Sequence, residues 1–83
     1  MVSSEARSVI DRAKQLYAER LQSELEQDHF GRFVSIEPES GEIFLGDTLH
    51  EAVQAALAKH PERKSFTLRI GHRAALHLGG VTQ

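Results

Sequence analysis

The sequence predicts one α+β domain over residues 1–83, with the order helix, strand, strand, helix, strand. Three observations predict it. A chain of 83 residues has room for a single core only. Apolar residues recur at every third or fourth position over residues 5–28 and 49–57, as in amphipathic helices. They alternate with polar residues over residues 33–37 and 66–70, as in half-buried strands.

The expected sheet is small, mixed and three-stranded. A strand-helix-strand connection is almost always right-handed and makes its two strands parallel if both lie in one sheet, so the second and third strands should be parallel. We expect both helices to pack on one face of this sheet. The N-terminal helix should cover about residues 4–29, and the α/β core about residues 30–80.

The first helix presents a continuous apolar stripe. Ser3 or Ser4 can cap its start, and Gly31 can adopt the left-handed conformation that ends a helix. Its roughly six turns exceed what the rest of so short a chain covers easily. The first two turns should therefore project from the domain or pack on another copy of the chain.

A β-hairpin should follow the first helix. The segment 38–41, with the sequence PESG, supplies turn chemistry, and Gly41 can accept a positive φ. Three carboxylates, those of Glu37, Glu39 and Glu42, crowd the tip of this hairpin. We expect them to form a solvated, charged turn that keeps the sheet edge from aggregating.

The second helix has clear signals at both ends. Thr48 and Glu51 have the spacing of a capping box, and Pro61 forbids continuation beyond the last turn. After the third strand, Gly71 permits a bend. Residues 72–78 should then continue as a strand, with Ala74, Leu76 and Leu78 inward, the alternative being a short helical turn.

The residues expected in the core are the apolar members of these periodic segments. They are Val9, Ala13, Leu16, Tyr17, Leu21, Val34, Ile36, Ile43, Leu45, Leu49, Val53, Ala56, Leu57, Phe66, Leu68 and Ile70.

Composition excludes several classes of protein. The chain is 40% hydrophobic and 27% charged, which is typical of a globular domain. With no cysteine it can form neither a disulfide nor a thiolate zinc site, which suits a reducing compartment. No apolar run approaches the roughly 18 residues that cross a bilayer, and the N-terminus lacks the apolar block of a signal peptide. We expect a cytoplasmic protein without membrane contact.

No set of residues predicts catalysis or cofactor binding. None of the serines lies in a strained strand-to-helix elbow, so we expect no catalytic residue. The five histidines lack metal-ligand spacing, and His29 and His60 fall at helix ends, where a cation is favoured. The segment 46–48, GDT, lacks the glycines and lysine of a phosphate loop. We therefore expect no metal, no cofactor and no small-molecule substrate.

Charge is unevenly distributed along the chain. Residues 1–58 carry five Lys and Arg against eleven carboxylates, a net charge of −6, whereas residues 59–83 carry five against one, a net charge of +4. Three explanations stay open: internal pairing with the acidic first helix, a protein partner, or nucleic acid. The candidate partner-binding residues are the cations and histidines of the basic stretch: Arg63, Lys64, Arg69, His72, Arg73 and His77.

A series of turn and strand residues carries a resemblance to a known family. It comprises Gly31-Arg32-Phe33-Val34-Ser35-Ile36, Gly41, Gly46-Asp47-Thr48, Glu51-Ala52, Pro61 and Arg69-Ile70-Gly71-His72. The series resembles a group of short bacterial and cyanobacterial proteins, a domain of unknown function, with a G-K/R-F/W-V-A-I strand, G-D-S/T, a helix, a proline and R-V/I-G. The resemblance covers about residues 30–80 and does not extend to the long first helix.

The resemblance implies a small α+β protein with no assigned activity or cofactor. Some members are encoded beside small aspartic-protease-like or toxin-like genes, which implies a partner rather than a substrate. We therefore expect a non-enzymatic interaction module, either a homodimer or a regulatory or antitoxin-like partner of a neighbouring gene product. The alternative is a nucleic-acid-binding protein that uses the basic C-terminal strand; an enzyme ranks third.

Overall fold

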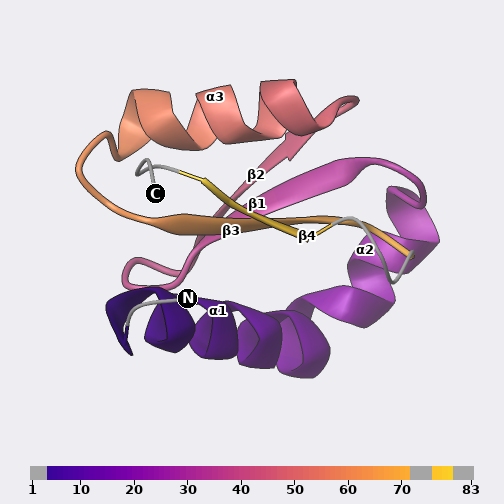
Figure 1. The fold of residues 1–83 in the computed structure, drawn as a ribbon. Coiled ribbons are helices and arrows are strands. Elements are labelled where there is room, and N and C mark those ends of the chain that lie inside the picture. The colour runs from indigo at the N-terminus through magenta and orange to yellow at the C-terminus, as the bar shows by residue number, and fades with distance from the viewer. Residues whose placement is uncertain (1–3, 72–75, 80–83) are drawn as a thin grey trace.

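The computed structural model describes residues 4–71 and 76–79, which form the α+β domain that the sequence predicts (Figure 1). The expected order of helix, strand, strand, helix and strand is confirmed, and a further short strand follows. The elements are α1 (Ser4–Leu16), the π-helical segment η1 (Tyr17–Leu21), α2 (Gln22–Asp28), β1 (Phe33–Glu37), β2 (Glu42–Gly46), α3 (Leu49–Lys59), β3 (Ser65–Arg69) and β4 (Leu76–Gly79).

The sheet has four strands in the order β2-β1-β3-β4, and every neighbouring pair is antiparallel. The expectation of a mixed, three-stranded sheet is therefore wrong. The crossover through α3 does set β2 and β3 in the same direction, but β1 lies between them and pairs with both. The fourth strand folds back along β3, with His77 opposite Thr67, instead of extending it. The predicted inward position of Ala74 lies outside the described residues.

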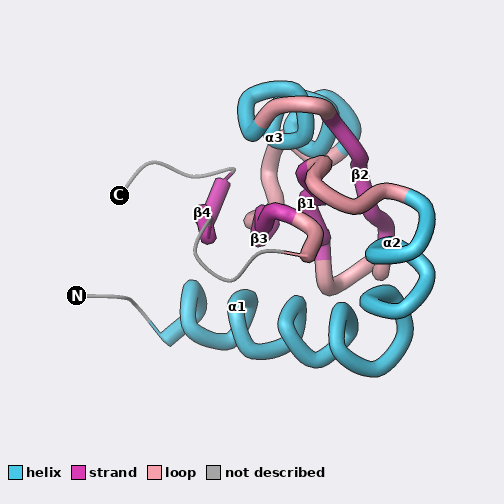
Figure 2. Tube along the Cα trace, turned by 90° about the vertical axis from the view of Figure 1, so that its right-hand side faces the viewer, coloured by secondary structure: helices cyan, strands magenta, loops and turns pink. Residues whose placement is uncertain are grey.

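The helices lie on opposite faces of the sheet, which corrects the expectation that both pack on one face. In Figures 1 and 2, α3 lies above the strands, whereas α1 lies below them. The physical reason is that β1 is buried on both faces: Val34 and Ile36 have no exposed surface, and neither has Ser35 between them. A sheet with no solvent-facing side needs a covering layer on each face.

The larger apolar core lies on the α1 side of the sheet. It consists of Ala13, Leu25, Val34, Ile36, Phe66, Leu68 and Ile70, with Ile10, Leu16, Tyr17, Leu21, Ile43 and Leu45 partly buried against it. Of the sixteen residues expected in the core, seven are buried, and five that are partly buried, Leu16, Tyr17, Leu21, Ile43 and Leu45, pack against the cluster. The other four, Val9, Leu49, Val53 and Leu57, are half-buried outside it. Leu25 and Ala52 were not expected, yet both are buried.

The π-helical segment η1 explains how Leu25 reaches this core. Leu25 follows Ala13 by twelve residues. In a continuous α-helix its side chain would point roughly 120° away from that of Ala13 around the helix axis. A π-bulge accommodates one extra residue and so removes about 100° of this rotation, which brings both side chains back to one face of the helix. Tyr17 Oη also donates a hydrogen bond to Glu26 Oε2 at 3.4 Å, which ties η1 to α2.

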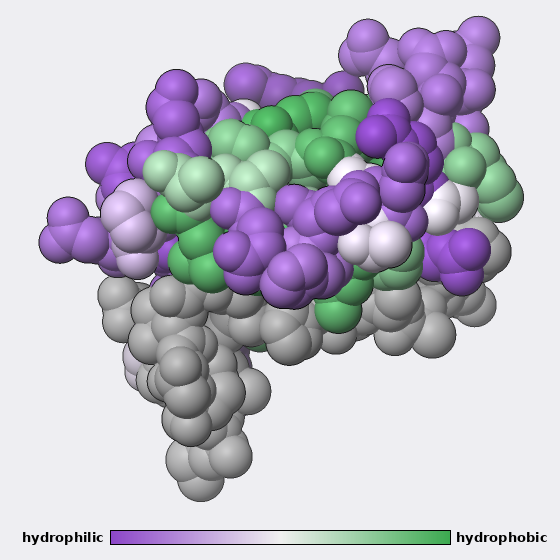
Figure 3. Space-filling model, turned by 90° about the horizontal axis from the view of Figure 1, so that it is seen from above, coloured by the Kyte–Doolittle hydropathy of each residue, from purple (hydrophilic) through white to green (hydrophobic). Residues whose placement is uncertain are grey.

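A layer of small polar side chains lies on the opposite face, under α3. Thr67 Oγ1 donates to Ser35 Oγ at 3.0 Å, and Ser35 Oγ donates to Ser65 Oγ at 3.0 Å. All three side chains are buried, and the buried residues of α3 are Ala52 and Ala56. The outer surface on this side carries a band of apolar atoms bordered by hydrophilic ones (Figure 3).

The start of α3 is capped as the sequence predicts, with one difference. Thr48 Oγ1 accepts a hydrogen bond from Glu51 N at 3.1 Å, whereas the Glu51 carboxylate accepts from Asp47 N at 2.9 Å, one residue before the cap. The helix also approaches β2 closely. A Cβ added at Gly46 would lie 2.6 Å from Ala52 N and 2.8 Å from Glu51 Cβ, so only glycine fits at this contact.

Candidate functional site

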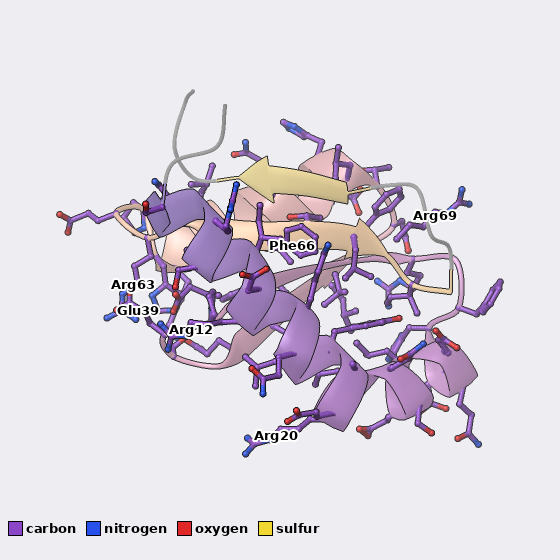
Figure 4. All side chains as sticks on the ribbon, turned by 60° about the horizontal axis from the view of Figure 1, so that its bottom comes forward. Arg12, Arg20, Glu39, Arg63, Phe66 and Arg69 are labelled. Carbon is purple, nitrogen blue, oxygen red and sulfur yellow. The ribbon has the colours of Figure 1, made fainter. Side chains whose placement is uncertain are left out.

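The structure divides the predicted partner-binding residues between two ends of β3. Arg63 and Lys64 precede the strand, whereas Arg69 is its last residue. Figure 4 shows Arg63 and Arg69 at opposite ends of the molecule. His72 and Arg73 lie outside the described residues, and only the backbone pairing of His77 with Thr67 is described. The basic stretch therefore contributes to two surfaces.

A groove runs between α1, the hairpin loop and the segment before β3. It consists of two hollows of about 460 Å³ and about 260 Å³ that share Arg12 and Pro38. The larger hollow is lined by Ser8, Val9, Arg12, Pro38, Glu39, Glu62, Arg63 and Lys64, and the smaller one by Arg12, Gln15, Leu16, Glu19, Arg20 and Pro38. We call both together the α1 groove; Arg12, Glu39 and Arg63 lie close together at its wider end (Figure 4).

Glu37 holds one wall of the α1 groove in place. Its side chain is 1% exposed and accepts hydrogen bonds from Ser40 N at 2.8 Å, from Glu39 N at 3.0 Å and from Arg63 Nη1 at 3.1 Å. The expectation of a fully solvated hairpin tip is therefore wrong for Glu37, because three donors converge on its carboxylate and replace water. Gly41 has a φ of 79°, as the turn prediction requires.

The same contacts keep Glu37 ionised. Burial alone would raise the pKa of its carboxyl, but the hydrogen bonds from Ser40, Glu39 and Arg63 outweigh burial and lower the pKa to about 2. The ionised, buried carboxylate binds one nitrogen of the Arg63 guanidinium, and this residue, which lines the larger hollow, has further N–H donors. The Arg63 side chain is 42% exposed, so these donors are accessible to a ligand.

The α1 groove is locally basic in a chain whose net charge is −2. Four cations, Arg12, Arg20, Arg63 and Lys64, line it against three acids, Glu19, Glu39 and Glu62. Glu19 already accepts a hydrogen bond from Gln15 Nε2 at 3.1 Å. Among the residues that the structure describes, neither Arg12 nor Arg20 belongs to an ion pair. Sequence reasoning missed both arginines, because each is an ordinary exposed position of an amphipathic helix.

The second surface lies at the opposite end of β3. Phe30 lies there with 62% of its surface accessible, and its ring rests against Gly71. The guanidinium carbon of Arg69 lies 5.7 Å from the centre of the Phe33 ring, and Arg69 Nε donates to Gly31 O at 3.1 Å. Neither Phe30 nor Phe33 is among the residues that the sequence predicts for the core.

The predicted helix-end histidines lie where expected. His29 follows α2, and His60 follows α3. The His60 ring contacts the Glu42 carboxylate and meets Phe44 edge to face at 6.0 Å. His60, together with Lys59, lowers the pKa of Glu42. Within residues 4–71 and 76–79, no three His, Cys, Asp or Glu side chains are grouped to hold a metal ion.

No family model matches the chain, and neither curated proteins nor solved structures give a match. The resemblance to a domain of unknown function therefore stays a prediction. None of the helices in the described part of the chain has both the length and the apolar character needed to cross a membrane.

Proposed function

We propose that the protein is a non-enzymatic interaction module whose α1 groove binds a carboxylate-bearing segment of a protein partner. One observation carries the proposal. Arg12 and Arg20, which have no ion pair among the described residues, line the same groove as Arg63, which the buried Glu37 carboxylate holds in place.

The shape and lining of the groove favour a peptide over a small substrate. Small-molecule sites are mostly apolar and enclose their ligand, with few polar groups. The larger hollow has one wall from α1 and another from two loops, and charged side chains predominate in its lining. Ser8 lies there without a histidine among the described lining residues, so the groove gives no support for a serine nucleophile activated by histidine.

Arginine chemistry favours carboxylates as the recognised groups. A guanidinium group offers a planar fork of donors that fits a carboxylate with two parallel hydrogen bonds. Each exposed ion pair contributes only about 0.2–1 kcal/mol, so useful affinity requires several pairs along one segment. The groove offers Arg63 in the larger hollow, Arg12 where the two hollows meet, and Arg20 in the smaller one. Binding should therefore weaken as salt rises.

The test uses a fluorescein-labelled octapeptide of alternating glutamate and glycine, with a lysine-glycine peptide as the opposite-charge control. Fluorescence anisotropy measures the affinity of the parent chain, of R12E/R20E and of R7E. Arg7 is an exposed residue of the same helix that does not line the groove. We expect R12E/R20E to bind at least about tenfold more weakly, and R7E to differ from the parent by less than about twofold.

Sedimentation equilibrium identifies a second copy as the partner. If the parent chain dimerises and R12E/R20E does not, the bound segment comes from another copy of the chain. Equal loss of peptide binding in R7E and R12E/R20E would show that overall charge, not the groove, decides affinity, and would overturn the proposal. So would a parent chain that stays monomeric at about 100 μM and binds neither the acidic peptide nor a co-purified protein.

A further inference from the structure

Strand β2 lies at one edge of the sheet, and its outer side has no neighbouring strand among the described residues. The order β2-β1-β3-β4 places β1 beside it on one side only. Of the backbone hydrogen bonds that residues 4–71 and 76–79 form outside the helices and the sheet, none involves residues 43–45. Every second residue of an edge strand directs its N–H and C=O groups outward. We call this outward row of donors and acceptors, over residues 42–46, the β2 edge.

The β2 edge lacks the features that usually prevent a strand from pairing with another chain. Such features are a lysine or proline within the strand, a β-bulge, or a charge that points inward. The central residues of β2 are Ile43, Phe44 and Leu45, and all three are half-buried. Five successive residues of β2 pair with β1 in unbroken register, so the strand has no bulge. Its one charged residue, Glu42, lies at the end and already pairs with Lys59.

The sequence of β2 is complementary to itself in an antiparallel pairing. When Phe44 lies opposite Phe44 of a second copy, Ile43 lies opposite Leu45, and Glu42 lies opposite Gly46. The three central pairs are then apolar, and cross-strand pairs of aromatic and aliphatic side chains stabilise a sheet. Such a pairing has a two-fold axis through its centre, which is the commonest symmetry of homodimers.

The charges beside the β2 edge also suit a two-fold pairing. At one end of the strand, the mostly exposed Lys59 has its Nζ 3.7 Å from the Glu42 carboxylate. At the other end, the mostly exposed Asp47 accepts a hydrogen bond from Arg32 Nε at 2.9 Å. Because the two copies run in opposite directions, the Lys59 end of one meets the Asp47 end of the other. Each end of the paired strands therefore gains contacts between opposite charges.

A two-fold pairing also keeps the layers of the domain in order. In Figure 2, β2 and β4 lie on opposite sides of the sheet, with α3 above the strands and α1 below them. A two-fold axis normal to the sheet leaves each face on its own side. Both copies of α3 would therefore lie above the joined sheet and both copies of α1 below it, so each face keeps a covering layer.

We propose that two copies of the chain pair through their β2 edges, with Phe44 opposite its counterpart, and join four strands from each copy into one continuous sheet. The outward backbone groups of both strands then form hydrogen bonds with each other, as in other strand additions. A second copy is the expected occupant because β2 itself supplies the matching apolar pairs and the matching end charges. This interface is separate from the α1 groove, so it does not rest on the proposed peptide binding.

The first test uses a cysteine at the proposed two-fold axis. The chain contains no cysteine, so F44C adds a single thiol. Residues directly opposite each other in an antiparallel pair have Cα atoms about 4.5–5.5 Å apart, which a disulfide can span. In a glutathione redox buffer, F44C should form a covalent dimer. A18C is the control, because Ala18 is exposed and belongs to η1; it should form at least about tenfold less dimer.

The second test exchanges charges at the same contact and needs no disulfide. F44K and F44E each place two like charges opposite one another in the dimer. Sedimentation equilibrium at about 100 μM should therefore find each variant alone monomeric and the parent chain dimeric. An equimolar mixture of F44K and F44E places opposite charges across the axis and should dimerise again. Recovery in the mixture would show that both variants are folded, and thermal unfolding of each one checks this independently.

Three results would overturn the proposal. They are a parent chain that is monomeric at about 100 μM, equal dimer formation by F44C and A18C, and a mixture of folded F44K and F44E that stays monomeric. R12E/R20E, which alters the α1 groove, should dimerise as the parent does. A dimer that R12E/R20E loses and F44K keeps would assign self-association to the groove instead. The titration of the α1 groove with the acidic peptide has an outcome independent of all these results.

Discussion

Arg63 Nη1 donates a hydrogen bond to Glu37 Oε1 at 3.1 Å, joining the end of β1 to the segment that precedes β3. The two residues lie 26 positions apart in the chain, and the glutamate is almost fully buried. Arg63 lines the larger hollow opposite α1 and the buried Glu37 binds it from behind, so we expect this pair to support both the stability of the domain and the shape of the candidate site.

Replacing Glu37 by alanine should therefore lower the free energy of unfolding substantially. The change leaves Ser40 N and Glu39 N without their acceptor and removes the partner of Arg63, so we expect a loss of about 2–4 kcal/mol in the free energy of unfolding. R63A should lose only about 1 kcal/mol, because that side chain is 42% exposed. Urea denaturation of both variants measures the difference. Equal losses would mean that the backbone donors to Glu37 contribute little.

The free energy of unfolding should fall in acid because the Glu37 carboxylate becomes protonated. The pKa of Glu37 is lowered from 4.5 to about 2 on folding, so the folded state binds the proton less tightly than the unfolded state does. The stabilisation is complete above pH 4.5 and is lost as the pH falls through about 2, a change of about 3 kcal/mol. Urea denaturation at successive pH values should show this loss for the parent. E37Q should lack it, and an unchanged acid slope in E37Q would assign the effect elsewhere.

Because η1 holds one extra residue, we expect two single-residue deletions in the first helix to differ in their effect on stability. Removing the exposed Ala18 should convert η1 to α-helix and still leave Ala13 and Leu25 on one face, so the melting temperature should change by only a few degrees. Removing the exposed Asp11 should instead rotate Val9 and Ile10 by about 100° away from the sheet, at a cost of about 2 kcal/mol. Equal destabilisation by both deletions would show that η1 has some other role.

The approach of α3 to β2 can be tested with one added methyl group. G46A places a Cβ within 2.6 Å of backbone Ala52 N, so we expect a loss of about 2–3 kcal/mol or more. G41A is the matched control: its Cβ meets nothing within 4 Å, and only its φ of 79° opposes the change, at about 1 kcal/mol. Thermal unfolding ranks the two variants. A more stable G46A than G41A would contradict the close contact.

Local features of the fold could be predicted from the sequence, and long-range ones could not. The Thr48 cap on Glu51 and the positive φ of Gly41 depend on neighbouring residues, and the sequence predicts both. The central position of β1 depends on which strands pair, and periodicity does not specify that. The burial of Ser35 on the second face, which places α3 opposite α1, resembles an ordinary solvent-facing strand position in the sequence.

The candidate site likewise combines a local feature, which the sequence indicates, with long-range contacts, which it does not. The sequence indicates Arg63 and Lys64 through their place in a basic stretch, but the groove exists because α1 passes beside the hairpin loop. Arg12 and Arg20 could be found only once that contact was known. The π-helical segment could not be predicted either, because the three- and four-residue spacings from Ala13 to Leu25 look like one continuous helical stripe in the sequence.

The hydroxyl layer beneath α3 divides the domain into two unequal halves. The buried residues of α3 are alanines above a layer of serine and threonine, and its larger apolar side chains, Leu49, Val53 and Leu57, are only half-buried. We therefore expect separation of this helix from the sheet to expose less apolar surface than separation of α1 would. Amide protons of α3 should therefore exchange with deuterium through a local opening, ahead of those in β1 and β3, which are also covered by the apolar core on the α1 side. The molecule can loosen its upper layer while the lower one, which carries the α1 groove, stays assembled.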